Sequence, residues 1–342
     1  MKSRIKGFLF LCCTVAIFLL TGCEHKDLCY VHPHTARLIV KVDWILFTVE
    51  EPTGMTVIAY PVSGGSPVVS RSNNTSYTTM PLTSQTYNLL AFNQSESEFG
   101  TFSFEGTDSY ETVKVVGRQH ASRWYKTRSD DEFIIHDPEW LGVDAQQDIT
   151  VTDEQLQYVG KVHAEGRSEG DSREYVIATM YPQNVIKRVR VRVHMTNIHG
   201  LYFTRAALSG MASECYLSSS VATGGKATHL LESWTKVTDA DEPTIGYVEA
   251  YCTSFGLHDT HQGQADENIL QFSVLLTDGN QLDWNIPVGD LIVQDAEDPS
   301  LLTIDYWVLD LPEVEEPEEG EIGGFNATVV DWGDEITTEI DM

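Results

Sequence analysis

Two pairs of histidines lie close enough in the sequence to share a metal ion. His32 and His34 flank Pro33, and two residues separate His258 from His261. A metal site normally draws three or four Cys, His, Asp or Glu ligands at a defined geometry, and neither pair has a convincing third partner. We therefore interpret these histidines as structural, and we predict no metal site and no cofactor.

Carboxylates are abundant, with 51 Asp and Glu against 22 Lys and Arg. Acid pairs suitable for glycoside hydrolysis can therefore be drawn almost anywhere, so they predict nothing. Neither a phosphate-binding glycine loop nor a dinucleotide fingerprint is present in the sequence. The formal charge of −29 repels phosphate backbones. We predict that the chain is neither an enzyme nor a nucleic-acid-binding protein.

The cysteine with the clearest chemistry is Cys23. Residues 1–22 have the three parts of a signal peptide, and their apolar run, 8–20, is too short to cross a bilayer about 30 Å thick. The segment 20–23, Leu-Thr-Gly-Cys, resembles the lipobox of bacterial lipoproteins, in which the cysteine thiol is acylated and the preceding peptide bond is cut. Two or three acyl chains, palmitate among them, anchor a protein stably. We predict a lipoprotein of the outer membrane, exposed at the cell surface.

Three other cysteines remain after such a signal peptide is removed: Cys29, Cys215 and Cys252. An exported chain meets an oxidising compartment, but three thiols cannot all pair within one chain. Cys215 and Cys252 are the favoured disulfide because both lie in alternating segments of the same predicted domain. The alternative, that all three stay reduced, is equally compatible with the sequence.

Two of the seven tryptophans, Trp124 and Trp140, lie in polar or loop-like surroundings. An indole ring in such a place can stack on a sugar or anchor a protein partner. The alternative is partial burial under loops.

The elements that must position these residues are almost all strands. From residue 35 onward, short alternating segments are separated by Gly-, Pro- and Asn-rich turns, which is typical of a β-sandwich. The 320 residues after the signal peptide (342 − 22) are enough for two domains. We predict an all-β fold with a tether at 23–34, a first domain at 35–180 and a second at 181–311. The expected strands are 35–44, 55–60, 67–70, 76–82, 85–92, 99–104, 112–116, 132–135, 148–152, 185–196, 201–208, 214–219, 246–254, 269–276 and 281–287.

The clearest strand is 185–196, where three valines from 189 to 193 alternate with three arginines from 188 to 192. One face is therefore apolar and the other cationic. We interpret the arginines as a solvated face that balances nearby carboxylates, with an anion site as the alternative.

The C-terminal segment 312–342 is predicted to be an acidic linker followed by a strand. From Asp310 to the end there are twelve acidic residues and no Lys or Arg, and such a linker cannot fold on its own. The alternating stretch after it needs an edge to pair with, in this molecule or in another. The residues expected to pair are Phe325, Thr328, Val330 and Trp332.

These motifs together resemble the fimbrillin-associated lipoproteins of type V fimbriae, a group that includes the anchoring minor subunit. The resemblance implies two tandem transthyretin-like, Greek-key β-sandwich domains and strand donation between subunits. It is carried by the lipobox with its Cys-Glu-His-Lys-Asp start, Val42-Asp43-Trp44, Gly54-Met55, Tyr60-Pro61, Gly64-Gly65, the stretches 87–93 and 208–212, Thr277-Asp278-Gly279, and 329–332.

We expect a lipid-anchored surface protein that anchors, caps or assists the assembly of a fimbria, or acts in adhesion. Its partners would be fimbrial subunits or other surface proteins, bound through β-strand contacts. The alternative is a glycan-binding outer-membrane lipoprotein that works beside a nutrient transporter and uses exposed aromatic rings.

Overall fold

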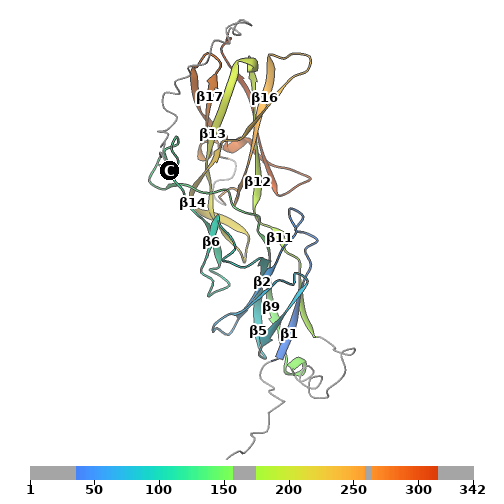
Figure 1. Ribbon diagram of the computed structural model, residues 1–342. Helices are drawn as coiled ribbons and strands as arrows, with labels where there is room; N and C mark the ends of the chain where they lie inside the picture. Colours follow the sequence, from blue (N-terminus) through green and yellow to red (C-terminus); the bar gives the residue numbers. More distant parts are fainter. Residues whose placement is uncertain (1–35, 157–174, 259–263, 315–342) are drawn as a thin grey trace, which may run out of the picture.

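The computed structural model describes residues 36–156, 175–258 and 264–314. They form an elongated molecule with two β-sandwiches end to end (Figure 1). The predicted all-β fold is confirmed. No helix in these three ranges is long and apolar enough to cross a membrane.

The N-terminal sandwich packs a three-stranded sheet on a five-stranded one. The first has the order β10–β1–β4, made of β1 (Ala36–Val42), β4 (Tyr77–Leu82) and β10 (Val176–Met180). The second has the order β11–β9–β5–β2–β3, made of β2 (Met55–Pro61), β3 (Val68–Ser72), β5 (Thr86–Asn93), β9 (Gly142–Thr150) and β11 (Gln183–Asn184). Alternate side chains of the facing sheets, such as Leu38, Met80, Val57 and Leu89, share one buried core.

The C-terminal sandwich is larger. One sheet has the order β15–β16–β12–β20–β19, made of β12 (Lys187–Thr196), β15 (Trp234–Thr238), β16 (Ile245–Ser254), β19 (Ile292–Gln294) and β20 (Leu301–Asp310). The other has the order β18–β17–β13–β14–β8, made of β8 (Glu132–Ile134), β13 (Leu201–Tyr216), β14 (Val221–Leu231), β17 (Ile269–Leu276) and β18 (Gln281–Pro287). The short 3-10 helices are η1 (Ile198–Gly200), η2 (Ala265–Glu267) and η3 (Gly289–Leu291).

The segment between β5 and β9 leaves the N-terminal sandwich. Its strands β6 (Phe102–Glu105) and β7 (Lys114–Gly117) pair with each other, β7 pairs with β13, and β8 runs parallel to β14. The sequence places these strands in the first domain, whereas they complete a sheet of the C-terminal sandwich. The reason is that β13 continues past its pairing with β17, so its last residues offer an edge that β7 covers. The boundary near residue 180 stays a prediction.

This crossing segment and one face of the N-terminal sandwich belong to the hydrophobic core of the C-terminal sandwich, while the N-terminal sandwich keeps a separate core between its own sheets. β2 and β5 are buried on both faces, and Ile58 and Phe92 on their second face pack into the same cluster as the C-terminal sandwich. Phe102 lies with its ring centre 6.2 Å from that of Phe255. Strands that are covered on both sides carry nearly continuous apolar runs, as β2 and β5 do.

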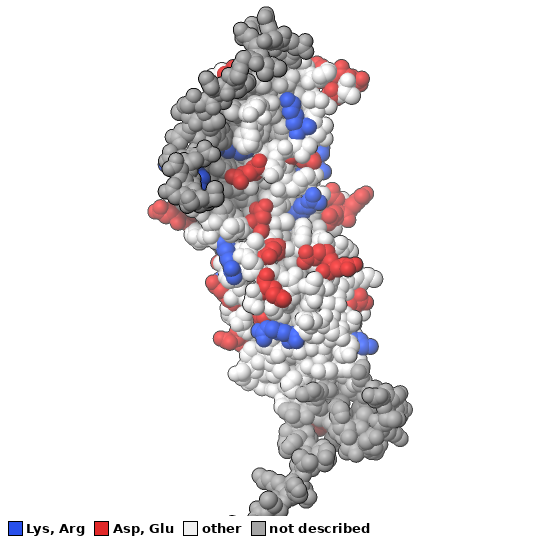
Figure 2. Space-filling model, in the orientation of Figure 1, with Lys and Arg blue, Asp and Glu red and all other residues white. Residues whose placement is uncertain are grey.

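The two faces of β12 differ as its alternation predicts. Its three valines, at 189, 191 and 193, are fully buried. On the outer face, Arg192 lies 2.7 Å from Glu249, and Arg190 lies 3.6 Å from Asp305. The interpretation of these arginines as a face that balances carboxylates is confirmed. Elsewhere, acidic and basic side chains are interspersed along the long axis of the face shown in Figure 2.

Candidate functional site

A groove of about 610 Å³ opens where the two sandwiches meet. β11 of the N-terminal sandwich borders it on one side, and β14, β19 and β20 of the C-terminal sandwich border it on the others. Its apolar lining residues are Val185, Val221, Ala222, Phe255, Leu257, Ile292 and Leu302.

Both sheets of the C-terminal sandwich present a strand edge to this groove. β19 is the last strand of its sheet, and the N–H of Asp295, just after it, donates to the Leu301 carbonyl at 2.9 Å. In an antiparallel pair, successive residues point their N–H groups alternately toward the partner strand and away from it. Because the N–H of Asp295 points toward β20, those of Gln294 and Ile292 point away from it. On the facing sheet, β8 pairs with β14 only from Lys226 onward, which leaves the outer side of Val221 without a strand in the described part of the chain. An unpaired edge is a template for an added strand.

The chemistry of the groove suits an extended apolar segment that carries an acidic residue beside its apolar side chains. Among the described residues that line it, Lys187 is the one charged side chain, and its Nζ donates to the Pro299 carbonyl at 2.9 Å. Burial lowers the pKa of Lys187, because the charged ammonium loses solvation. A carboxylate brought close to this half-buried cation would restore favourable electrostatics.

The two tryptophans proposed from sequence as contact residues are both half-buried. Trp124 donates its indole N–H to Glu232 at 2.7 Å, and the guanidinium of Arg205 lies 4.6 Å from its ring centre. Trp140 packs against the main hydrophobic core. Neither Trp124 nor Trp140 lines the groove. Their role in binding a partner or a glycan stays a prediction.

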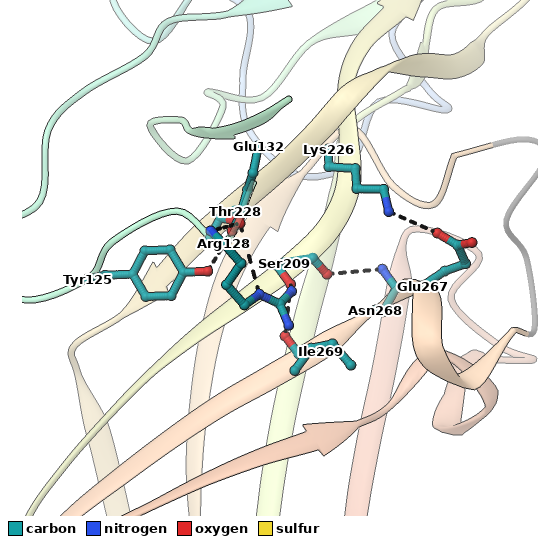
Figure 3. A network of polar contacts seen from close by, with 9 residues as sticks. All are labelled: Tyr125, Arg128, Glu132, Ser209, Lys226, Thr228, Glu267, Asn268 and Ile269. Carbon is teal, nitrogen blue, oxygen red and sulfur yellow. Dashed lines mark hydrogen bonds and ion pairs between the residues drawn. The ribbon is translucent and has the colours of Figure 1, made fainter. Parts of the chain in front are cut away.

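A buried polar network holds the loop that carries Trp124 (Figure 3). At its centre, Glu132 accepts hydrogen bonds from the hydroxyls of Tyr125 and Thr228 and from the backbone N–H of Arg128. The guanidinium of Arg128 in turn donates to the Ser209 hydroxyl on β13. Burial, together with the bond to Glu132, raises the pKa of Tyr125 to about 12. These contacts fix residues 125–132 against β13 and β14.

The same network continues to the start of β17. Asn268 donates to the Ser209 carbonyl at 3.3 Å, and Lys226 lies 3.3 Å from Glu267. Between these residues Gly210 has a φ of +83°, and a Cβ there would lie 1.9 Å from the Glu267 carbonyl oxygen. Only glycine permits this close approach, which forms a bulge in β13 beside a pocket of about 230 Å³.

The predicted disulfide is not formed. Cys215 on β13 and Cys252 on β16 are both free and buried. They belong to facing sheets and have different neighbours, Lys187 near the first and Asp137 near the second. Burial raises the pKa of Cys215 to about 12 and raises that of Cys252 well above its ordinary value. For these two residues the structure shows the reduced alternative.

The other predicted site residues lie outside the described residues. They are the lipidation site Cys23, the tether cysteine Cys29, the histidines His32, His34 and His261, and the strand-pairing residues Phe325, Thr328, Val330 and Trp332.

Comparison with protein-family models identifies the family of the chain. A family model described as "Domain of unknown function (DUF5119)" matches residues 22–232, more than half of the chain. The chain belongs to the DUF5119 family. The match begins one residue before Cys23 and ends just after β14, so it extends across the boundary expected near residue 180.

The DUF5119 chain is also related in sequence to a protein named "Putative fimbrium anchoring subunit Fim4B" from Bacteroides ovatus. The two are 27% identical over 115 residues, which are 34% of this chain and 33% of the relative. The matched stretch thus spans about a third of the relative. This relationship confirms the resemblance to fimbrium-associated proteins that the motifs indicate.

Solved structures show the fold of the DUF5119 chain. A "putative adhesin" from Bacteroides ovatus ATCC 8483 superposes with a TM-score of 0.56 at 16% identity, over 86% of this chain and 99% of that one. At this identity the likeness concerns the fold alone. The fimbrial anchor protein Mfa2 from Porphyromonas gingivalis superposes more loosely, with a TM-score of 0.44 at 13% identity, over 79% of this chain and 90% of that one.

Proposed function

We propose that this protein is a lipid-anchored surface protein that anchors or caps a fimbria, and that a fimbrial subunit binds it by adding a strand in the groove between β14 and β19. The observation that carries the proposal is the pair of strand edges that face one apolar groove. The sequence relationship to a protein named as a fimbrium anchoring subunit supports the choice of partner. The lipobox supports the anchor.

The occupant that fits best is an extended segment whose apolar side chains alternate. Val221, on the β14 side of the groove, is 38% exposed, and Ile292, on the β19 side, is half-buried, so each has surface to bury against such a segment. Backbone hydrogen bonds to β19 would supply affinity, and the pockets for alternate side chains would supply specificity. Lys187 favours an acidic residue in the segment, although the formal net charge of the protein is −29.

Proline at position 294 tests the strand edge directly. Gln294→Pro removes an N–H that faces away from β20, so the sheet keeps its internal pairing while the edge loses a donor. We expect binding to fimbriae sheared from the parent cells to weaken about tenfold or more. The measurement is surface-immobilised binding of the purified protein.

Gln294→Ala is the matched control. It removes the same side chain, including the hydrogen bond from Nε2 to the Pro299 carbonyl at 2.9 Å, but keeps the backbone N–H. We expect Gln294→Ala to bind as the natural protein does. Equal binding by the proline and alanine variants, both folded, would exclude β19 as the contact.

A further inference from the structure

Three side chains with metal-binding atoms converge between the sheets of the C-terminal sandwich. Asp137 follows β8, His229 lies on β14 and Cys252 lies on β16, and one ligand atom from each falls within 4.8 Å of the other two. His229 Nδ1 is 3.0 Å from Asp137 Oδ1. None of the three lines the groove or belongs to the network of Figure 3.

The cluster is buried on one side and open on the other. His229 is 0% exposed and Cys252 is 4% exposed, whereas the Asp137 side chain is 44% exposed. His229 Nδ1 is the ring nitrogen that faces Asp137, so an ion shared by the two residues would bind there in place of the hydrogen bond. The other ring nitrogen, Nε2, is buried without a hydrogen-bond partner and would carry the proton. The exposed carboxylate gives an ion a route in from solvent.

The fold holds the three residues from different elements. His229 and Cys252 each lie within an antiparallel strand pair, so their backbones are fixed. Thr253 Oγ1 donates to the Pro138 carbonyl at 2.7 Å, which ties the residue after Asp137 to the strand that carries Cys252. The side chains therefore need only small rotations to meet at one point.

We propose that Asp137, His229 and Cys252 bind a divalent transition-metal ion of the zinc class. Carboxylate, imidazole and thiolate are ligands that such an ion takes, and three protein ligands leave a fourth position for water. Tetrahedral bonds of about 2.0–2.3 Å place ligand atoms roughly 3.5 Å apart. Separations near the 4.8 Å limit would therefore close by about 1 Å on binding, and the 3.0 Å between Asp137 and His229 would widen slightly. The ion would link His229 on one sheet to Cys252 on the other, with Asp137, from the segment after β8, as the third ligand.

Binding has a defined proton balance. The S–H bond of Cys252 breaks, a metal–sulfur bond forms, and one proton leaves to solvent. In the absence of an ion, burial and the charge of Asp137 raise the pKa of Cys252. A dication beside the sulfur reverses this effect, because it stabilises the thiolate.

Cobalt(II) titration of the purified full chain tests the site. We expect one equivalent to bind with a thiolate-to-cobalt charge-transfer absorption, and zinc to displace it. Cys252→Ser is expected to abolish this absorption. Cys215→Ser is the matched control, since Cys215 is another free, buried thiol of the same sandwich, and it is expected to keep the absorption.

Two results would overturn the site: no thiolate absorption in the natural protein, or the same absorption in Cys252→Ser. If circular dichroism shows that Cys252→Ser is unfolded, Asp137→Asn decides, because its side chain is partly exposed and its loss leaves the core intact. That variant is expected to bind cobalt at least tenfold more weakly. Unchanged affinity would overturn the proposal.

Discussion

Replacing Glu132 with alanine is expected to lower the free energy of unfolding by about 3 kcal/mol. The Glu132 side chain is 3% exposed and accepts hydrogen bonds from Tyr125, Thr228 and the backbone of Arg128. Its loss would leave these donors without an acceptor in a place that water reaches poorly, and it would leave Arg128 without its carboxylate. Denaturant unfolding followed by circular dichroism measures the change.

Glu105→Ala is the control for this prediction. Glu105 also faces a cation, Lys114 at 3.8 Å, but its side chain is 54% exposed. A surface pair of this kind contributes less than about 1 kcal/mol. If the two alanine variants lose the same stability, the network of Figure 3 does not hold the loop that carries Trp124.

Replacing Cys23 with alanine is expected to abolish attachment to the outer membrane. Without the thiol no acyl chain can be added, and no other segment of the sequence is apolar for long enough to hold the chain in a bilayer. The measurement is incorporation of labelled palmitate, together with the amount of protein in the outer-membrane fraction of the cells that make it.

Cys29→Ala is the matched control, because it removes a cysteine six residues further on and leaves the lipobox intact. We expect this variant to incorporate palmitate as the natural chain does. Labelling that persists in Cys23→Ala would contradict the anchor.

Much of the strand pattern could be predicted because alternation and turn residues are local signals. The expected strands 55–60, 76–82 and 269–276 agree with β2, β4 and β17 to within a residue. The rest depended on distant contacts. The sequence predicts separate strands at 201–208 and 214–219, but Gly210 forms a bulge that keeps β13 continuous from Leu201 to Tyr216.

β14 and β20 were missed for different reasons. Gly224 and Gly225 make β14 resemble a loop, although its partners β13 and β8 hold it in the sheet. In β20, Leu301 and Leu302 stand side by side, and Tyr306 and Trp307 do so further along, which hides the alternation.

The candidate sites could not be predicted for a more general reason. The groove depends on which strands end a sheet, and strand order is a property of the whole fold. Asp137, His229 and Cys252 are far apart in the sequence, so no local spacing rule can bring them together. Conversely, the lipobox depends on a few consecutive residues, so the sequence alone can suggest it.

Photo-crosslinking in intact cells tests the central claim most directly. A photoreactive amino acid at Gln294, which lines the groove on the edge strand β19, is expected to link this protein to a fimbrial subunit, and mass spectrometry should place the link in an extended terminal segment of that subunit. The control position is Tyr202, near the start of β13, which is 73% exposed and does not line the groove. The same probe at Tyr202 is expected to give no such product. A subunit linked equally from both positions, or from Tyr202 alone, would contradict strand addition at the groove.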